Sequence, residues 1–316
     1  MDTPEHVRVA ESLGYERAWL YDSPALYPDV WVALALAAER TSTIGLGPAV
    51  LVPSLRHPMT NAAAIATLEA LAPGRVAVAL GAGFTGRYVL GQKPMRWTDV
   101  GDYVRVLKAL LRGETTEWDG AAVKMLHPEG FGAGRPIEVP ILIGADGPKG
   151  LGVAREVADG IFSAGRPVDG EGPSWRAVLL FGTVLADGEP VTSDRVLGAA
   201  GHGLAVAYHA LYERGGAAAV DGLPGGATWR AQIEAAPPEQ RHLLTHENHL
   251  VSLTPRDRAA LAEGASLMTA ISFTGTRDEL RDKVAVLEAA GATEIAYQPA
   301  GPDIPGELER MRNAID

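Results

Sequence analysis

Hydrophobic residues along the chain follow two alternating patterns. Short apolar runs rich in β-branched and small residues predict buried strands, and segments with apolar residues three or four positions apart predict amphipathic helices. The pattern is clearest from 43 to 83, where a strand (TIGLGPAV) leads through a turn to a helix beginning at Pro58 and to a second strand ending at Gly81. A strand, a helix and a strand form one βαβ unit, and its two strands are expected to be parallel.

This alternation continues along most of the chain. A hairpin over 114–125 that turns at Asp119-Gly120 stands outside the repeat. Thr276 and Glu279 are spaced as a capping box and mark the start of a late helix. The predicted strands are 17–21, the run from 43, 75–80, 140–143, 160–163, 176–186 and 294–297, and the predicted helices are 3–13, 29–40, 58–71, 98–112, 148–158, 276–290 and 305–315.

The stretch around 190–265 breaks the repeat and reads as a mainly helical insertion. Helices are predicted over 193–214, 229–244 and 255–263, with a glycine-rich segment over 215–226. We expect one domain over 1–316, because no linker interrupts the series. The alternation favours α/β structure with a TIM-type (β/α)8 barrel, and a doubly wound parallel sheet is the rival.

Composition narrows the class of protein. The chain has 316 residues, is 47% hydrophobic and 21% charged, and carries a formal net charge of −11. The negative net charge and the lack of a cluster of Lys and Arg argue against nucleic acid or an anionic membrane as a partner. The absence of Cys excludes disulfides, thiol catalysis and thiolate metal sites. The polar N-terminus and the lack of a long apolar run predict a cytoplasmic protein.

In a barrel, the carboxyl ends of the strands carry the site. Residues 81–86 read GAGFTG and match GxGxxG, but Gly91 and Pro94 interrupt the helix that a dinucleotide fingerprint requires, so a glycine-rich bend is the better interpretation. Residues 144–149 read GADGPK and join a strand to a helix that begins at Pro148. Small residues, the helix dipole and Lys149 suit an anion there, although an ordinary βα turn has the same composition.

Several longer segments are similar, in order, to one known family. RAWLYD at 17–22, RHP at 56–58, LAPGRVAVALGAG at 71–83, IGADGPKGLGVAREVADGI at 143–161 and GTRDELRDKVAVLEAAGATEI at 275–295 resemble the bacterial luciferase-like monooxygenase family. Within it, the chain is most similar to the branch that uses the deazaflavin coenzyme F420. The resemblance implies a (β/α)8 barrel, usually a homodimer, that binds flavin or deazaflavin at the strand ends. Since the family barrel begins with a strand and this chain begins with a helix, we expect the first strand to be missing or replaced.

The resemblance also assigns roles to residues. It implies a non-prolyl cis peptide at Ala49-Val50 that backs the cofactor ring, Asp22 near cofactor and substrate, and Arg87 against the ring. It implies that the loop from Gly144 holds the phosphate-bearing tail, and it leaves Arg56 and Arg75 as structural residues that pair with backbone or acidic neighbours. The residues expected to bind the cofactor are Asp22, Ala49, Val50, Val52, Gly83, Phe84, Arg87, Gly144, Ala145, Asp146, Gly147 and Lys149.

Two departures change the expected chemistry. Ser23 stands where the family's sugar-phosphate dehydrogenases have His, and Phe84 stands where they have an acidic residue. Without that proton-handling pair, reduction of an activated C=C or C=N bond is favoured over alcohol oxidation. Ser23, Tyr27 and His246 are the candidate catalytic residues, and Phe84 is expected to shape an apolar substrate pocket.

The sequence RHLLTHENHL places three histidines at spacings of four and three, on one face of a predicted helix. The zinc motif HExxH is absent, so no metal site is expected from this spacing. His246 and His249 are instead expected to dock the helix or reach the substrate.

Three hypotheses for function follow. The first is an oxidoreductase that transfers hydride between F420 and a small organic substrate. The second is an FMN-dependent monooxygenase that uses reduced flavin and oxygen. The third is a barrel that binds a cofactor without turnover.

Overall fold

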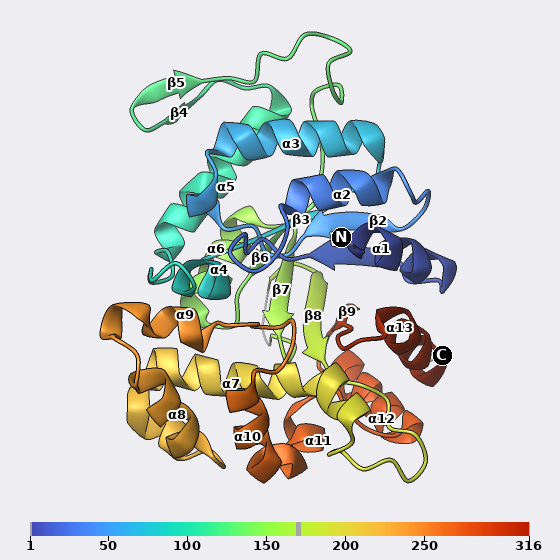
Figure 1. Ribbon diagram of the computed structural model, residues 1–316. Helices are drawn as coiled ribbons and strands as arrows, with labels where there is room; N and C mark the ends of the chain where they lie inside the picture. Colours follow the sequence, from blue (N-terminus) through green and yellow to red (C-terminus); the bar gives the residue numbers. More distant parts are fainter. Residues whose placement is uncertain (1, 169–171, 316) are drawn as a thin grey trace. The chain divides into compact units, whose positions relative to one another are not determined.

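The computed structural model describes residues 2–168 and 172–315 (Figure 1). The chain divides into two compact units. Among the described residues, the first unit comprises 2–87, 93–168, 172–178 and 291–294, and the second comprises 88–92, 179–290 and 295–315. The prediction of a single domain with a late insertion stays a prediction.

The first half of the chain alternates strands and helices as predicted. A hairpin turns at Asp119 and Gly120, which both have positive φ, and so confirms the predicted turn. The elements are α1 (Thr3–Ser12), β1 (Arg17–Leu20), α2 (Val30–Ala38), β2 (Gly45–Pro48), the 3-10 turn η1 (Pro53–Leu55), α3 (Pro58–Leu71), β3 (Val78–Gly81), α4 (Phe84–Tyr88), α5 (Trp97–Arg112), β4 (Thr116–Trp118), β5 (Ala121–Val123), β6 (Ile141–Gly144), α6 (Pro148–Val157) and β7 (Gly160–Ala164).

The second half is mainly helical. The predicted capping box is present at the start of α12, where the Thr276 side chain accepts from the Glu279 amide and the Glu279 side chain accepts from the Thr276 amide. The elements are β8 (Trp175–Phe181), α7 (Asp194–Asp221), α8 (Gly226–Glu234), η2 (Pro238–Gln240), α9 (Arg241–Thr245), α10 (Pro255–Gly264), η3 (Ala265–Leu267), α11 (Met268–Ile271), α12 (Arg277–Ala289), β9 (Glu294–Gln298) and α13 (Ile304–Ile315).

The strands outside the hairpin follow the order of the chain. β1 pairs with β2 in parallel, and a five-stranded sheet has the order β3-β6-β7-β8-β9. Parallel bridges join Leu46 to Val76 and Leu51 to Leu80, and so connect the β2 segment to the β3 segment. A doubly wound sheet reverses its strand order at a switch point, and the described strands show no such reversal. This order favours the barrel-type series over its rival.

Helix ends follow local chemistry. α3 and α6 each begin at a proline, whose missing N–H and fixed φ suit the first helical position. In the first unit, α2 contacts α3 and α3 contacts α5 (Figure 1). The amphipathic α5 buries Tyr103, Leu107 and Leu110.

Three sequence expectations need correction. A five-residue helix, α4, opens directly after the glycine-rich bend and ends before Gly91, where none was expected. α7 consists of two helical stretches that meet at Gly216, whose φ +69° and ψ −164° are not helical, so the predicted helix does end close to residue 214. The correction concerns the stretch after Gly216, which is helical as far as Asp221 because 217–219 are alanines with high helix propensity. β8 ends at Phe181, five residues earlier than predicted.

The second unit has its own hydrophobic core. Trp229, Tyr208 and Leu204 are at most 2% exposed and pack with residues of α7, α8 and α10. Trp229 Nε1 donates to Asp257 Oδ1 at 2.9 Å, so a polar group inside this core has its partner. In the described part of the chain, no helix combines the length and hydrophobicity needed to cross a membrane.

Candidate functional site

The strand ends of the first unit meet at one edge, because their pairing is parallel. Leu20 lies opposite Pro48, Leu51 is bridged to Leu80, and Gly81 lies opposite Gly144. The residues that follow these positions are the ones predicted to bind a cofactor. The structure therefore brings 22–23, 49–52, 81–87 and 144–147 to the same edge.

The peptide bond between Ala49 and Val50 is cis, which confirms the prediction. The Val50 side chain fills the space that two glycines leave open. A Cβ placed on Gly81 would lie 2.8 Å from Val50 Cγ2, and one on Gly144 would lie 2.5 Å from Val50 Cγ1. The ends of β3 and β6 must therefore be glycine for Val50 to sit where it does.

Val52 makes a second contact of this kind. A Cβ on Gly83 would lie 2.6 Å from Val52 Cγ1, and one on Gly86 would lie 3.1 Å from Val52 Cγ2 and 3.4 Å from Ser23 Oγ. Gly83 also has φ +82°, a conformation that L-residues rarely adopt. Val50, Val52 and the glycines facing them form a small-residue platform. Its glycines Gly81 and Gly86 were not among the predicted cofactor-binding residues, because the Val contacts are not local in sequence.

Asp22 is a buried anion with a complete set of partners. Arg56 Nη1 donates to Asp22 Oδ1 and Oδ2, each at 2.7 Å, and the Val52 amide donates to Asp22 Oδ2 at 3.3 Å. Arg56 Nη2 also donates to Asp29 Oδ2 at 2.8 Å. The expectation that Arg56 pairs with acidic neighbours is confirmed. Asp22 thereby ties β1 to the segment that carries Val52.

Arg75 follows the same expectation. Its Nη1 donates to Thr41 Oγ1 at 3.1 Å and to the Ile44 carbonyl at 3.2 Å. These contacts lie where the chain enters β2. Arg75 is a structural residue of this turn.

Arg87 holds the short helix α4 in place. Its Nε donates to the Lys93 carbonyl at 2.6 Å, and its Nη1 donates to Ser54 Oγ. The first of these bonds closes the loop after α4, and the second joins α4 to η1. The Arg87 side chain is half-buried next to Gly83, where a Cβ would meet Arg87 Cγ at 2.9 Å. Phe84 begins the same helix and is also half-buried.

The loop from Gly144 to Lys149 opens α6 at the surface. Pro148 is its first residue, as predicted, and Gly147 is its N-cap. Asp146 Oδ1 accepts from the Ala164 amide at 2.9 Å, and the Ala145 amide donates to the Phe162 carbonyl at 3.1 Å, which fixes the loop on β7. Asp146, Gly147 and Lys149 are exposed, and a Cβ on Gly147 would meet nothing within 4 Å. An exposed helix start with open space and a lysine fits a phosphate group.

Ser23 and Tyr27 lie next to each other after β1. The Tyr27 amide donates to the Ser23 carbonyl at 3.0 Å, and the Tyr27 ring stacks on Tyr21 with centroids 5.5 Å apart. Burial raises the pKa of the Tyr27 hydroxyl, and that of Tyr21 as well. Both phenols are therefore protonated near neutral pH. Tyr21 was not among the predicted site residues, and the stacking that joins it to Tyr27 has no signal in the sequence.

His246 belongs to the second unit. The predicted helix carrying three histidines on one face is wrong, because α9 ends at Thr245 and Asn248 and Leu250 have positive φ. His246 Nε2 lies 3.2 Å from Glu213 Oε1, and its ring stacks on Tyr88 with centroids 6.1 Å apart. A catalytic role for His246 stays a prediction.

The model of the luciferase-like monooxygenase family matches residues 2–294. The chain belongs to this family. The prediction made from the sequence segments is thereby confirmed.

The chain is similar in sequence to a curated reductase, and in fold to solved structures of a reductase and a monooxygenase. A 5,10-methylenetetrahydromethanopterin reductase of Archaeoglobus fulgidus is 28% identical over 98% of this chain and 93% of its own length. The coenzyme F420 dependent tetrahydromethanopterin reductase of Methanopyrus kandleri has a TM-score of 0.65 at 22% identity, over 99% of this chain and 94% of that one. The oxygenating constituent of 3,6-diketocamphane monooxygenase from Pseudomonas putida, solved with FMN, has a TM-score of 0.60 at 14% identity, over 99% and 91%. These likenesses confirm the predicted fold class, a TIM-type α/β fold.

Proposed function

We propose that this protein is an oxidoreductase that binds coenzyme F420 at the strand ends of the first unit and exchanges hydride with a small organic substrate. The observation that carries the proposal is the small-residue platform, where Val50 packs onto Gly81 and Gly144 beside the exposed start of α6. A flat ring needs a smooth, apolar surface, and its phosphate-bearing tail needs N–H donors and positive charge. The named function of the Methanopyrus kandleri structure agrees with this choice of cofactor.

Each part of the site has a task in this proposal. Val50 and Val52 would hold one face of the ring, and Arg87 would contact it. Gly144, Ala145, Asp146 and Gly147 form the loop for the tail, and Lys149 adds charge at the start of α6. Asp22 acts through Arg56 and the Val52 amide by fixing the platform.

When bound, F420 supplies or accepts the hydride. The protein must then handle one proton. In reduction of an activated C=C or C=N bond, hydride adds to one atom and a proton adds to the other. Tyr27, whose hydroxyl is protonated near neutral pH, would donate this proton, and Ser23 would assist; water would then return the proton to Tyr27. Phe84 lines the substrate side.

A titration with each cofactor tests the proposal. Purified protein is titrated separately with F420 and FMN, and fluorescence gives the two dissociation constants. We expect F420 to bind at least about ten-fold more tightly, a difference of about 1.4 kcal/mol. Tighter FMN binding would support a flavin-dependent monooxygenase instead. Binding of neither would overturn the site, and F420 binding without any turnover would support a barrel that only binds cofactor.

Turnover is tested by mixing the protein with reduced F420 and activated alkenes, imines or ketones, and separately with oxidised F420 and secondary alcohols. Oxidation of F420 by the alkenes or imines is the expected result. Reaction with the alcohols or ketones alone would contradict the proposed substrate class.

Lys149→Glu tests the tail loop. The new carboxylate repels a phosphate at the start of α6, and we expect F420 affinity to fall about ten-fold. Lys124→Glu, an exposed lysine that follows β5, is the matched control. If the two variants bind F420 with equal affinity, the phosphate-bearing tail does not bind at this loop.

The assembly and location of the protein complete the proposal. We propose a homodimer, because Val32 and Leu36 are 55% and 36% exposed four positions apart on α2, an apolar stripe that a second copy would cover. Light scattering that shows a monomer would exclude the homodimer.

We also propose a cytoplasmic location. Cell fractionation would test it.

A further inference from the structure

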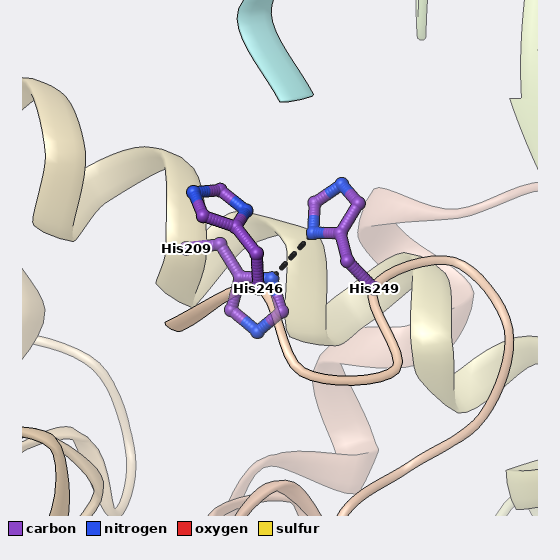
Figure 2. Close-up of side chains that lie close together, drawn as sticks. All are labelled: His209, His246 and His249. Atoms are coloured by element: carbon purple, nitrogen blue, oxygen red, sulfur yellow. Dashed lines mark hydrogen bonds between the residues drawn. The ribbon is translucent and has the colours of Figure 1, made fainter. Parts of the chain in front are cut away.

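Three buried histidines meet inside the second unit. His209 comes from α7, and His246 and His249 come from the segment directly after α9. Figure 2 shows their rings converging, and one ring nitrogen of each lies within 4.8 Å of the other two. The three residues are at most 2% exposed. Water therefore does not surround these nitrogens.

The nitrogens that face each other are not all satisfied. His209 Nδ1 and His249 Nδ1 lie 2.6 Å apart, so one donates to the other. His246 Nδ1 is buried and has no hydrogen-bond partner among the described residues. A buried acceptor or donor without a partner costs free energy, so it needs an explanation. A ligand in the space between the rings would supply one.

The outer nitrogens of two rings face carboxylates. His246 Nε2 lies 3.2 Å from Glu213 Oε1, and His209 Nε2 lies 3.8 Å from Asp257 Oδ1. In metal sites a ligating histidine usually directs its second ring nitrogen at a carboxylate or carbonyl, which fixes the tautomer and leaves the other nitrogen with a free lone pair. Glu213 has this arrangement within hydrogen-bond distance of His246, and Asp257 lies at ion-pair distance from His209. They also contribute negative charge close to the cluster.

We propose that His209, His246 and His249 bind one Zn²⁺ through their Nδ1 atoms, with an outer set formed by Glu213 and Asp257. Imidazole nitrogens are ordinary zinc ligands at about 2.0–2.1 Å, and tetrahedral geometry separates them by about 3.3 Å. The 2.6 Å spacing of His209 and His249 therefore widens by less than about 1 Å on binding. Three protein ligands leave a fourth position for water or an anion.

Imidazole binds a metal ion only in its neutral form, so zinc affinity should fall as the pH is lowered. Binding would also occupy His246 Nδ1 while Glu213 holds Nε2, which removes His246 from the candidate proton donors. The site lies within the second unit and does not depend on the proposed cofactor.

The sequence alone argued against a metal because HExxH is absent. The spacing grouped His242 with His246 and His249, but the third ring of the cluster belongs to His209, 40 positions before His249. His242 lies instead beside Gly91, where a Cβ would be 3.4 Å from its ring. This makes His242 the matched control.

The test uses the full chain, stripped with a chelator and then titrated with ZnCl2. Calorimetry and elemental analysis of the dialysed protein should give one zinc per chain, with a Kd tighter than about 1 μM. His246→Gln and His249→Gln should each weaken binding at least about 100-fold, and His242→Gln should bind like the wild type. No stoichiometric zinc in the wild type, or undiminished binding by both cluster variants, would overturn the proposal.

A second measurement does not depend on the variants folding. Wild-type protein loaded with Co²⁺ should give the intense visible absorption of a four-coordinate ion, and X-ray absorption of the zinc form should show three imidazoles. A weak, six-coordinate Co²⁺ spectrum, or a zinc shell made only of oxygen, would also overturn it.

Discussion

Arg56 Nη1 lies 2.7 Å from each carboxylate oxygen of Asp22, and the two side chains are only 13% and 1% exposed. A buried ion pair of this kind gives little net stability over an apolar pair. Removing Asp22 is different, because Arg56 then keeps only the more exposed Asp29 as a charge partner. The ion pair therefore holds the segment after β1 in place against the segment that carries Val52.

Asp22→Asn should destabilise the protein by about 2 kcal/mol, because Arg56 loses its buried carboxylate partner and keeps only Asp29, whose side chain is 47% exposed. Urea denaturation at neutral pH measures this loss. Asp99→Asn is the control, because Asp99 pairs with Arg96 at the surface, where the side chains are 37% and 81% exposed. That change should cost less than about 1 kcal/mol. If the two variants lose the same free energy of unfolding, the buried ion pair is no more important for stability than the surface pair.

Val50 and Gly144 provide a second test, by double-mutant cycle. Gly144→Ala places a Cβ 2.5 Å from Val50 Cγ1 and should cost about 1–3 kcal/mol through overpacking. Val50→Ala removes the methyl groups that collide, so the double variant should recover part of that loss, with a coupling energy of about 1 kcal/mol or more. Unfolding free energies of the four proteins measure the coupling.

Gly147→Ala controls for the general effect of replacing a glycine in this loop. A Cβ there meets nothing within 4 Å, and Gly147 has φ −112°, so no clash is expected. Additive losses for Val50→Ala and Gly144→Ala would show that the two side chains do not compete for one space.

Features set by neighbouring residues could be predicted from sequence. The capping box of Thr276 and Glu279 depends on residues three positions apart, and Pro148 starts α6 because its ring suits a first helical turn. The cis peptide at Ala49-Val50 has no local signal, and it was predicted through the family resemblance alone.

Features that depend on distant contacts could not be predicted. α4 forms although Gly91 lies close behind it, because Arg87 bonds to Ser54 and Lys93. The histidine cluster takes its third ring from α7, and no spacing rule connects that helix to His246. In both cases side chains far apart in sequence decide the local structure.

Glu11 should make stability depend on pH. Its Oε1 accepts from the amides of Ser42, Thr43 and Ile44 at 2.9, 2.6 and 3.0 Å. Burial acts to raise the pKa of Glu11, but these N–H donors outweigh it and lower the pKa to about 2 from 4.5. A lowered pKa stabilises the fold above pH 4.5, and the contribution is lost as the pH falls from 4.5 toward 2.

Glu11→Gln should therefore cost about 2 kcal/mol at pH 7, with allowance for partial exposure, and progressively less below pH 4.5. Urea denaturation at several pH values gives the difference from the wild type. Glu117→Gln, at an exposed position of the hairpin, is the control for the loss of one carboxylate. A Glu11→Gln difference that stays constant down to pH 3 would be inconsistent with the proposed titration.

Arg87 connects the fold to the proposed cofactor site. The planar guanidinium donates from Nε to the Lys93 carbonyl and from Nη1 to Ser54 Oγ, and an ammonium group cannot reproduce both directions at once. Arg87→Lys keeps the charge but frees α4 to shift beside Gly83. We expect F420 affinity to fall about ten-fold, with a smaller fall for Ser54→Ala, which removes one of the two bonds. Arg96→Lys, at a side chain that is 81% exposed, is the control and should bind F420 like the wild type. If Arg87→Lys also binds F420 like the wild type, then Arg87 neither touches the ring nor positions it.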